Sequence, residues 1–380
     1  MIYLNNAATS YPKFKETIDG IHNALINGSM GCKRDSVEDD NVNRIIFDLR
    51  ESISEMIHAK KPHSICFTHN DTVAINTILL GYKGLKQGDI VLTDKYVHNA
   101  VSRPLIQLQK EKGIKILYVD TIEEIKKVTK ENDGKIKFAI FSHGSNVTGD
   151  LIPVQEIGDI LYLQNIPLIL DVAQTLGVVD IDVEKMKISA LTFAGHKVLN
   201  GPQGTGGFYI RKGLPVKPIL FGGTGNNSMD LDPQVVFPDS FEVGTPAVHD
   251  LIGLYYSVDT ILNIIKFERY SSYLKEITAY AYKKLKNVPN IILYGNEEKE
   301  LPVISFNIKG MTAMEVGILL SNYDIICRTG VHCASKAIES MNVLDEYGGT
   351  VRVSFSWFTE EKEIDFLVES LLKIIQKKRA

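Results

Sequence analysis

A carboxylate and an amine in the central part of the chain stand where one cofactor can meet both. Asp171 ends the apolar run PLILDV, and Lys197 follows 26 residues later, just after the next apolar run. Since open α/β sheets hold their ligands at the carboxyl ends of the strands, we expect both side chains in one crevice. Pyridoxal phosphate needs such a pair: an amine to form a Schiff base and a carboxylate to keep the pyridine nitrogen protonated. Gln174 can then reach the phenolic oxygen of the ring.

The alternative is that Asp171 caps a turn and Lys197 lies at the surface, and three further features favour the cofactor. THNDTVAIN, at 68–76, begins a helix after a strand, so its backbone amides and the Thr72 hydroxyl suit a phosphate. We count Asp71, at the start of this helix, with the same group. His98 either stacks on an aromatic cofactor or caps a helix. Thr245, in FEVGTPA, is another phosphate donor or part of a plain interdomain turn.

The segment RTGVHCAS, at 328–335, carries a candidate nucleophile. Cys333 stands beside His332 and five positions after Arg328, and both neighbours offer a positive or proton-accepting group that favours a thiolate. The alternative is a buried cysteine that serves as a small hydrophobic residue. No C-x-x-C pair occurs, so neither a disulfide framework nor a metal site is predicted, and the other cysteines are expected to be structural: Cys32, Cys66 and Cys327.

Six short apolar runs alternate with helical periodicity through the first half of the chain. Strands buried on both faces and joined by helices are typical of a largely parallel sheet, so we predict an α/β fold. The predicted strands are 64–68, 90–93, 114–119, 137–142, 167–172 and 190–194, with an antiparallel strand at 204–210. Helices are predicted to begin near Asp71, His98, Thr121, Pro153 and Val183.

After about residue 245 the pattern changes to long helices and short strands. The predicted helices are 248–267 and 270–286, and the predicted strands are 291–294, 302–308 and 351–355. We therefore assign residues 15–247 to a large cofactor-binding domain, and residues 1–14 with 248–380 to a smaller α+β domain. The Gly-rich stretch 221–233 is predicted to be a functional or mobile loop.

Composition argues against several classes of function. The formal net charge is −4, and no run of Lys or Arg is long enough to follow a nucleic-acid backbone. No apolar stretch approaches the ~20 residues that cross a bilayer, and no signal peptide follows Met1, so we expect a soluble cytoplasmic protein. The glycine patterns of dinucleotide-binding and P-loop proteins do not occur.

Eight motifs appear in the order typical of one family: YLNNAATSYP, THNDTVAIN, HGSNVTGDLIPV, DVAQTLGVVDIDV, GHKVLNGPQGTGG, FEVGTPA, RTGVHCAS and TVRVSFSWFTEEKEID. Over nearly its whole length the chain resembles the class V aminotransferase superfamily of pyridoxal-phosphate enzymes, and within it the cysteine desulfurases and selenocysteine lyases. This resemblance implies the fold-type I architecture, a mostly parallel seven-stranded sheet between helices with a smaller α+β domain. Arg352 follows Cys333 by 19 positions, which is similar to desulfurases with a short cysteine loop.

The resemblance implies a role for each cofactor residue. Lys197 resembles the Schiff-base lysine, Asp171 the pyridinium partner, Gln174 the phenolate contact and His98 the stacking ring. Thr72 and His196 resemble phosphate ligands. Thr245 resembles a phosphate ligand that the family supplies from the second subunit, so the implied unit is a homodimer with shared active sites.

The resemblance also implies a substrate and a reaction. Asn146 resembles a residue close to cofactor and substrate, and Arg352 resembles the arginine that binds the substrate carboxylate in two-pronged fashion. Arg328 is counted with them as substrate-binding. Cys333 resembles the cysteine that attacks the sulfur of cofactor-bound cysteine and becomes a persulfide, which leaves alanine. A sulfur-acceptor protein is a further implied partner.

The chain also departs from the family pattern. Ala194 stands where Ser or Thr often precedes Gly-His-Lys, so one hydroxyl contact to the phosphate is expected to be missing, and Ser335 stands where Pro or Gln is usual. Alternative functions therefore stay open: a selenocysteine lyase, a β-lyase on another sulfur compound, a class V aminotransferase, or a non-catalytic sulfur carrier. The substrate is correspondingly L-cysteine, L-selenocysteine or another amino acid.

Overall fold

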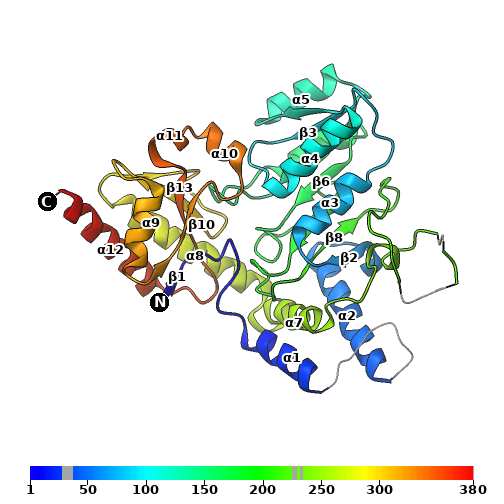
Figure 1. Cartoon of the computed structure of the whole chain (residues 1–380), viewed down its shortest axis with the longest axis horizontal. Coiled ribbons are helices and arrows are strands. Elements are labelled where there is room, and N and C mark those ends of the chain that lie inside the picture. Colours follow the sequence, from blue (N-terminus) through cyan, green and yellow to red (C-terminus); the bar gives the residue numbers. More distant parts are fainter. Residues whose placement is uncertain (28–36, 225–228, 232–233, 380) are drawn as a thin grey trace.

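The computed structural model describes residues 1–27, 37–224, 229–231 and 234–379. Cys32 and parts of the predicted loop 221–233 lie outside the described residues. Figure 1 shows two lobes, one around a large twisted sheet and one around a small sheet, with both termini at the small lobe. Within the described residues, no helix combines the length and the apolar character that crossing a bilayer requires.

Seven strands form the large sheet in the order β2-β8-β7-β6-β5-β3-β4. β8 runs antiparallel to both its neighbours and the remaining pairs are parallel, which confirms the predicted α/β fold and the antiparallel strand. All seven predicted strands are present, with ends that differ by at most two residues. Their bounds are β2 (Ile65–Thr68), β3 (Ile90–Thr93), β4 (Lys115–Tyr118), β5 (Ile136–Ser142), β6 (Leu168–Asp171), β7 (Ile188–Ala194) and β8 (Gly206–Ile210).

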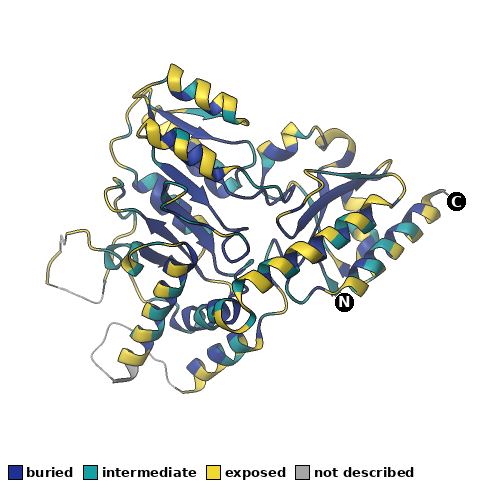
Figure 2. Cartoon of the chain, turned by 180° about the vertical axis from the view of Figure 1, so that it is seen from behind, coloured by how far each residue is buried: buried dark blue, intermediate teal, exposed yellow. Residues whose placement is uncertain are grey.

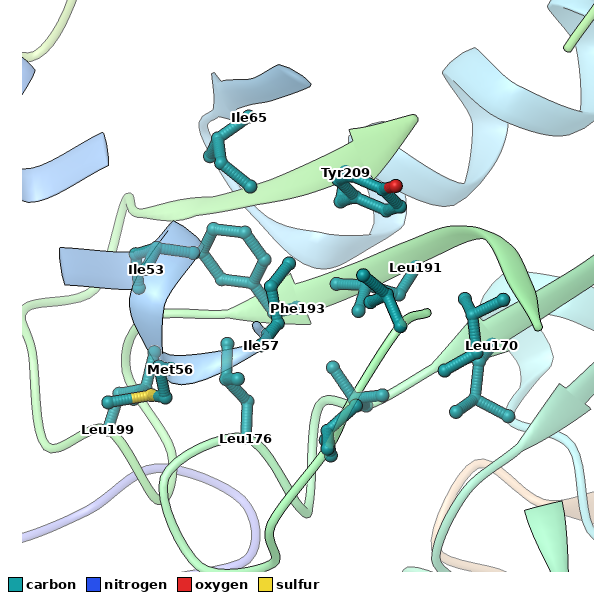
Figure 3. Packing of buried hydrophobic residues seen from close by; sticks show 14 of the residues in the cluster. Ile53, Met56, Ile57, Ile65, Leu170, Leu176, Leu191, Phe193, Leu199 and Tyr209 are labelled. Atoms are coloured by element: carbon teal, nitrogen blue, oxygen red, sulfur yellow. The ribbon is translucent and has the colours of Figure 1, made fainter. Parts of the chain in front are cut away.

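Apart from the edge strand β4, the sheet is buried on both faces, and the helices carry their exposed residues on their outer sides (Figure 2). Successive strand residues point to opposite faces, so Ile169 and Leu170, both fully buried, lie in different hydrophobic clusters. Figure 3 shows one cluster, where Ile53 and Ile57 lie beside Phe193 of β7. Because the buried strand side chains are closely packed on both faces of the sheet, the strand ends and their polar residues are held in fixed positions.

Six helices accompany this sheet: α1 (Lys15–Ile26), α2 (Val37–Met56), α3 (Asp71–Gly81), α4 (Asn99–Lys112), α5 (Ile122–Glu131) and α6 (Val154–Leu163). Capping side chains fix several starts, and the Asn70 side chain accepts the N–H of Val73 at the start of α3. The helix predicted near Val183 is wrong. Lys187 adopts a left-handed φ of 56° and β7 begins at the next residue, so the Asp182-capped segment makes only a turn.

The small lobe is built on a four-stranded antiparallel sheet of order β12-β13-β10-β9. The three predicted strands are present, whereas β1, β11 and β12, each of two or three residues, were not predicted. The bounds are β1 (Ile2–Tyr3), β9 (Ile291–Leu293), β10 (Val303–Ile308), β11 (Ile325–Ile326), β12 (Arg328–Gly330) and β13 (Thr350–Ser354), with helices α9 (Ala313–Ser321), α10 (Ser335–Ser340), α11 (Leu344–Tyr347) and α12 (Glu361–Arg379). β1 pairs with β11, which brings the N-terminus to this lobe.

Two long helices connect the lobes: α7 (Val248–Asp259), which continues as a π-helical turn (Thr260–Ile265), and α8 (Phe267–Lys286). The buried side of α7 packs in the hydrophobic cluster of the large sheet. Tyr270 at the start of α8 packs there too, whereas Leu285 near its end packs in the small lobe. α8 thus contributes to both clusters, and the predicted domain boundary after residue 247 stays a prediction.

A buried ion pair joins α2 to the chain segment that follows β8. Arg50 Nη1 donates to Glu242 Oε1 at 2.7 Å and to the Ile65 carbonyl at 2.7 Å, and Glu242 also accepts the N–H of Phe67 at 2.6 Å. The two side chains are 7% and 11% exposed. Each charge therefore depends on the other, because little water is available to solvate either one.

We expect Glu242→Ala to lower the free energy of unfolding by about 3–5 kcal/mol, because Arg50 would remain charged and buried without its partner. Urea unfolding followed by circular dichroism, at one protein concentration, measures the change. The matched control is Glu156→Ala, which removes the exposed pair of Lys126 Nζ and Glu156 Oε1 at 3.2 Å and should cost about 0–1 kcal/mol. Equal shifts in the two variants would contradict this expectation.

Candidate functional site

One pocket gathers most of the residues that the sequence singled out. It lies at the carboxyl ends of β5, β6 and β7 and at the first turns of α3 and α4, and the N-terminal segment and the small sheet close it. Ten predicted site residues line it: Asp71, Thr72, His98, Asn146, Asp171, Gln174, His196, Lys197, Arg328 and Arg352. The strand ends meet here because parallel strands place their carboxyl ends at the same sheet edge.

Asp171 and Lys197 face each other across the end of the sheet. Asp171 is the last residue of β6, pairs in register with Ser142 of β5, and accepts the N–H of Ala173 at 2.9 Å. Burial raises the pKa of Asp171, and the Ala173 amide and the Lys197 charge oppose this. Burial lowers the pKa of the Lys197 amine, while Asp171 and Asp71 raise it. The pocket thus offers an amine of reduced basicity beside a carboxylate.

The side of the pocket formed by the start of α3 can hold a phosphate. α3 begins there at Asp71, and Thr72 adds its hydroxyl. His196 Nδ1 is buried without a hydrogen-bond partner, and burial, Lys197 and Lys13 lower the pKa of this ring to about 4. Ala194 lines the same wall, so no hydroxyl is available at its position. A group with several acceptor oxygens would meet unused donors of α3, Thr72 and His196.

His98 combines the two functions that the sequence left open. It is the N-cap of α4, where its Nδ1 accepts the N–H of Ala100 at 3.0 Å, and its ring also lines the pocket. Burial and the charge of Lys197 lower its pKa to about 4. The ring is therefore neutral at pH 7, held in one tautomer by the cap, and suited to lie against an aromatic ligand.

Residues 5–10 complete the pocket from a distant part of the sequence. Gln174 Nε2 donates to the Ala7 carbonyl at 3.0 Å, and Ala7 and Ala8 line the pocket. The carbonyl of His196, next to Lys197, accepts from the backbone N–H and the hydroxyl of Ser10 at 2.9 and 3.0 Å. These residues, and Ser142 on β5, were not singled out as site residues. Only the N-terminal motif itself gave a signal, because small side chains show no chemistry in the sequence.

Two arginines of the small sheet form the electropositive end of the pocket. Arg328 of β12 and Arg352 of β13 are directly opposite in the antiparallel register, where like charges repel each other. Arg352 Nη1 donates to the Asn146 carbonyl at 2.8 Å, while its Nε is buried without a partner. Burial and Arg328 lower the pKa of Arg352 to about 9, which leaves it charged at pH 7. A carboxylate placed here would relieve the repulsion and fill the unused donor.

Arg328 also reaches the candidate nucleophile, since its Nη2 lies 3.1 Å from Cys333 Sγ. Cys333 and His332 both have left-handed φ values, 57° and 50°, a conformation that costs about 1–3 kcal/mol for such residues. Two bonds hold this turn: Asn99 N–H donates to the Cys333 carbonyl at 2.7 Å, and Asn146 Nδ2 donates to the His332 carbonyl at 2.8 Å. The thiol is thereby fixed next to the pocket.

His332 does not provide the positive charge that the sequence suggested. It is 1% exposed, its Nε2 lies 2.8 Å from Thr350 Oγ1, and burial with two arginines lowers its pKa well below 6.5. Arg328 is therefore the cation at Cys333. Burial raises the pKa of Cys327 to about 11, and Cys66 is fully buried in β2, which agrees with structural roles for both.

Thr245, a predicted site residue, does not line this pocket in its own chain. It is exposed and lines a second pocket together with Thr68, Gly204 and Phe241. Within one chain, the structure does not bring it together with Thr72 and His196.

Comparisons with known proteins agree over almost the full length. Residues 2–367 match the model of the family described as Aminotransferase class-V. The cysteine desulfurase of Wigglesworthia glossinidia brevipalpis is 30% identical, over 98% of this chain and 92% of that protein. The probable cysteine desulfurase of Pyrococcus abyssi is also 30% identical, over 87% and 83%. Among solved structures, the apo structure of a cysteine desulfurase from Thermococcus onnurineus NA1 superposes with a TM-score of 0.90 at 26% identity, covering 99% of this chain and 95% of that one.

We expect Arg328→Gln to slow alkylation of Cys333 by iodoacetamide at pH 7 by about tenfold, because a hydrogen bond to a charged group is worth about 1.5–3 kcal/mol. Peptide mass spectrometry after timed quenching assigns the rate to Cys333. Arg328→Lys, which keeps a positive charge, should lose less. An unchanged rate in Arg328→Gln would show that Arg328 does not stabilise the thiolate.

Proposed function

Because this chain belongs to the class-V aminotransferase family and matches cysteine desulfurases over its length, we propose that it is a pyridoxal-phosphate-dependent cysteine desulfurase. It converts L-cysteine into L-alanine and takes the sulfur onto Cys333. The observation that carries the proposal is the thiol of Cys333, held 3.1 Å from Arg328 at a pocket that also contains Lys197, Asp171 and Arg352.

The pocket has side chains suited to both the ring and the phosphate of pyridoxal 5′-phosphate. Lys197 would hold the cofactor through its amine, and Asp171 would accept the N–H of the protonated pyridine nitrogen. Thr72, His196 and the first amides of α3 would bind the phosphate, Gln174 would reach the phenolic oxygen, and the neutral His98 ring is available to stack on the cofactor. Bound pyridoxal phosphate supplies an electron-accepting ring that makes the Cα–H of an attached amino acid acidic.

The substrate is oriented by the small lobe. Arg352 binds the α-carboxylate, for which its buried Nε is available, and Asn146 lies beside it with its carbonyl on the Arg352 guanidinium. Arg328 lies beside Arg352, where the substrate carboxylate would bind, and it also contacts Cys333. The Lys197 amine takes the proton from the substrate Cα and later returns a proton to the product.

Sulfur transfer is the task of Cys333. Its thiolate attacks the substrate sulfur, an S–S bond forms, the Cβ–S bond breaks, and the electron pair passes to Cβ, which is then protonated to give alanine. No external oxidant is needed, because the sulfur is transferred from carbon to Cys333 with its bonding electrons left on the substrate. The left-handed turn at 332–333 keeps the thiol at the pocket wall during this step.

A homodimer with shared sites would account for the position of Thr245. It lines a pocket together with Leu220, Phe241 and Val243, and Leu220 is 55% exposed, so apolar side chains lie around it. A second copy seated on this surface would carry Thr245 into the phosphate end of the neighbouring pocket. A sulfur-acceptor protein and a cytoplasmic location remain predictions.

We expect the wild-type protein to show a visible absorbance band with bound cofactor that borohydride abolishes, and to form alanine and sulfide in equal amounts from L-cysteine with a thiol reductant. Lys197→Ala should lose both the band and the reaction. Cys333→Ala should keep the band and lose at least about a hundredfold in alanine formation, because it removes the nucleophile. Full turnover of L-cysteine by Cys333→Ala would refute the assigned sulfur transfer.

Two further assays distinguish the related reactions. Activity of Cys333→Ala towards L-selenocysteine alone would indicate a selenocysteine lyase, and formation of a new amino acid from a keto acid would indicate an aminotransferase.

We expect co-expression of a Lys197→Ala chain with a Thr245→Glu chain to restore about half of the wild-type cofactor band in the mixed dimer. If each site combines Lys197 of one chain with Thr245 of the other, one site of the mixed dimer carries both substitutions and the other site carries neither. Each homodimer alone should bind poorly, because Lys197→Ala removes the amine and Thr245→Glu places a negative charge against the phosphate. Affinity tags on each chain isolate the mixed dimer, and light scattering confirms its mass. A mixed dimer without restored binding would contradict shared sites.

A further inference from the structure

Two carboxyl groups, rather than one, face the amine of Lys197. Asp71 is the first residue of α3 and lines the same pocket as Asp171 and Lys197. Its position is fixed by Gly206 of β8, since a Cβ there would lie 2.7 Å from the Asn70 carbonyl carbon and 2.8 Å from Asp71 N. Only glycine lets the first turn of α3 approach the sheet this closely. Asp71 Oδ1 is buried and has no hydrogen-bond partner.

The surroundings of the two carboxyl groups differ. Asp171 accepts the N–H of Ala173 at 2.9 Å, whereas Asp71 Oδ1 accepts nothing. Burial and the charge of Asp171 raise the pKa of Asp71, and Lys197 and Thr192 oppose this. Because the Ala173 N–H stabilises the charged form of Asp171 and no such donor reaches Asp71 Oδ1, the geometry favours Asp71 as the proton-holding member of the pair.

Among the residues that the structure describes, Lys197 is the one positive group that acts on Asp71. The titratable or charged groups that face this pair from the packed elements are His98, His196, Lys197, Arg328 and Arg352. Both histidines have pKa values lowered to about 4 and are neutral at pH 7. Arg328 is engaged with Cys333 and Arg352 with Asn146, at the far end of the pocket.

Asp71 also stands at the end of the pocket proposed for the phosphate, between Asn70 and Thr72. An ionised Asp71 would repel a phosphate dianion and compete with it for the amides of α3. A neutral Asp71 instead presents an O–H donor to a phosphate oxygen or to Asp171. The phosphate and the proton on Asp71 therefore favour each other.

We infer that Asp71 is a proton-carrying positioning residue of the cofactor site, so that phosphate binding in this pocket takes up a proton and weakens on the alkaline side of neutrality. This inference rests on the proposed cofactor, though not on the proposed substrate. The sign follows from linkage: the protonated form binds more tightly, so affinity is lost as pH rises through the pKa of Asp71.

The test uses pyridoxine 5′-phosphate, which lacks the aldehyde and cannot form a Schiff base with Lys197. The measured affinity therefore does not include the pH dependence of that covalent bond. Its dissociation constant is measured by fluorescence titration of the cofactor-free protein between about pH 7 and pH 9. We expect the dissociation constant of the wild type to rise by up to about tenfold per pH unit relative to that of Asp71→Asn, which is neutral throughout. Equal pH dependence in both proteins would overturn the inference.

The matched control is Asp94→Asn. Asp94 is a buried carboxyl at the end of β3 whose pKa burial raises to about 7, and it is absent from the pocket lining. This variant should keep the wild-type pH dependence; loss of that dependence here would also overturn the assignment to Asp71.

A second measurement counts protons directly. Calorimetry of pyridoxine 5′-phosphate binding at about pH 8, in buffers of different ionisation enthalpy, gives the number of protons exchanged by the wild type and by Asp71→Asn. A larger uptake in the wild type supports the inference, and equal numbers contradict it, because protonation of the pyridine nitrogen contributes equally to both. Failure of the proposed function gives a different result, namely no cofactor band with pyridoxal phosphate at any pH.

Discussion

A lysine amine enclosed between two carboxyl groups at one edge of a parallel sheet is the constraint that orders the rest of the site. Enclosure disfavours the charged amine, and the acidic neighbours Asp171 and Asp71 favour it. This balance holds only if the three groups stay in place. The sheet provides that, since Asp171 pairs in register with Ser142 on one side and Thr192 on the other, and Gly206 lets α3 bring Asp71 against the strand ends.

The other half of the site comes from segments that are far away in the sequence. The loop between β5 and α6 is the junction: the Ser305 hydroxyl donates to the Val147 carbonyl at 2.6 Å, and Lys299 Nζ donates to the Thr148 carbonyl at 2.7 Å. Lys299 is 2% exposed and also donates to the Tyr294 carbonyl at 2.9 Å. Because Asn146 belongs to this loop, the bonds that join the two lobes also set the distance between the cofactor residues and Arg352.

The thiol is held by the same junction. Left-handed backbone at two consecutive residues is unfavourable, and it persists because the carbonyls of His332 and Cys333 are both bonded to the large lobe. The proposed nucleophile Cys333 thus lies on an anchored turn beside Arg328, and α10 and α11 lie in the chain between Cys333 and Arg352.

The sequence by itself determined the α/β class and the positions of the main strands along the chain, because apolar runs fix strands, and its chemistry together with its family motifs singled out ten residues that meet in one pocket. It failed at Val183, where a helix was predicted but β7 begins at Ile188 and leaves room only for a turn capped by Asp182. It also gave no sign of Ser142, of the Asn99 amide at Cys333, or of His332 being neutral. Those features depend on burial and on contacts between distant segments, which only the tertiary structure decides, since the pKa of a side chain and the use of a backbone N–H follow from what surrounds them.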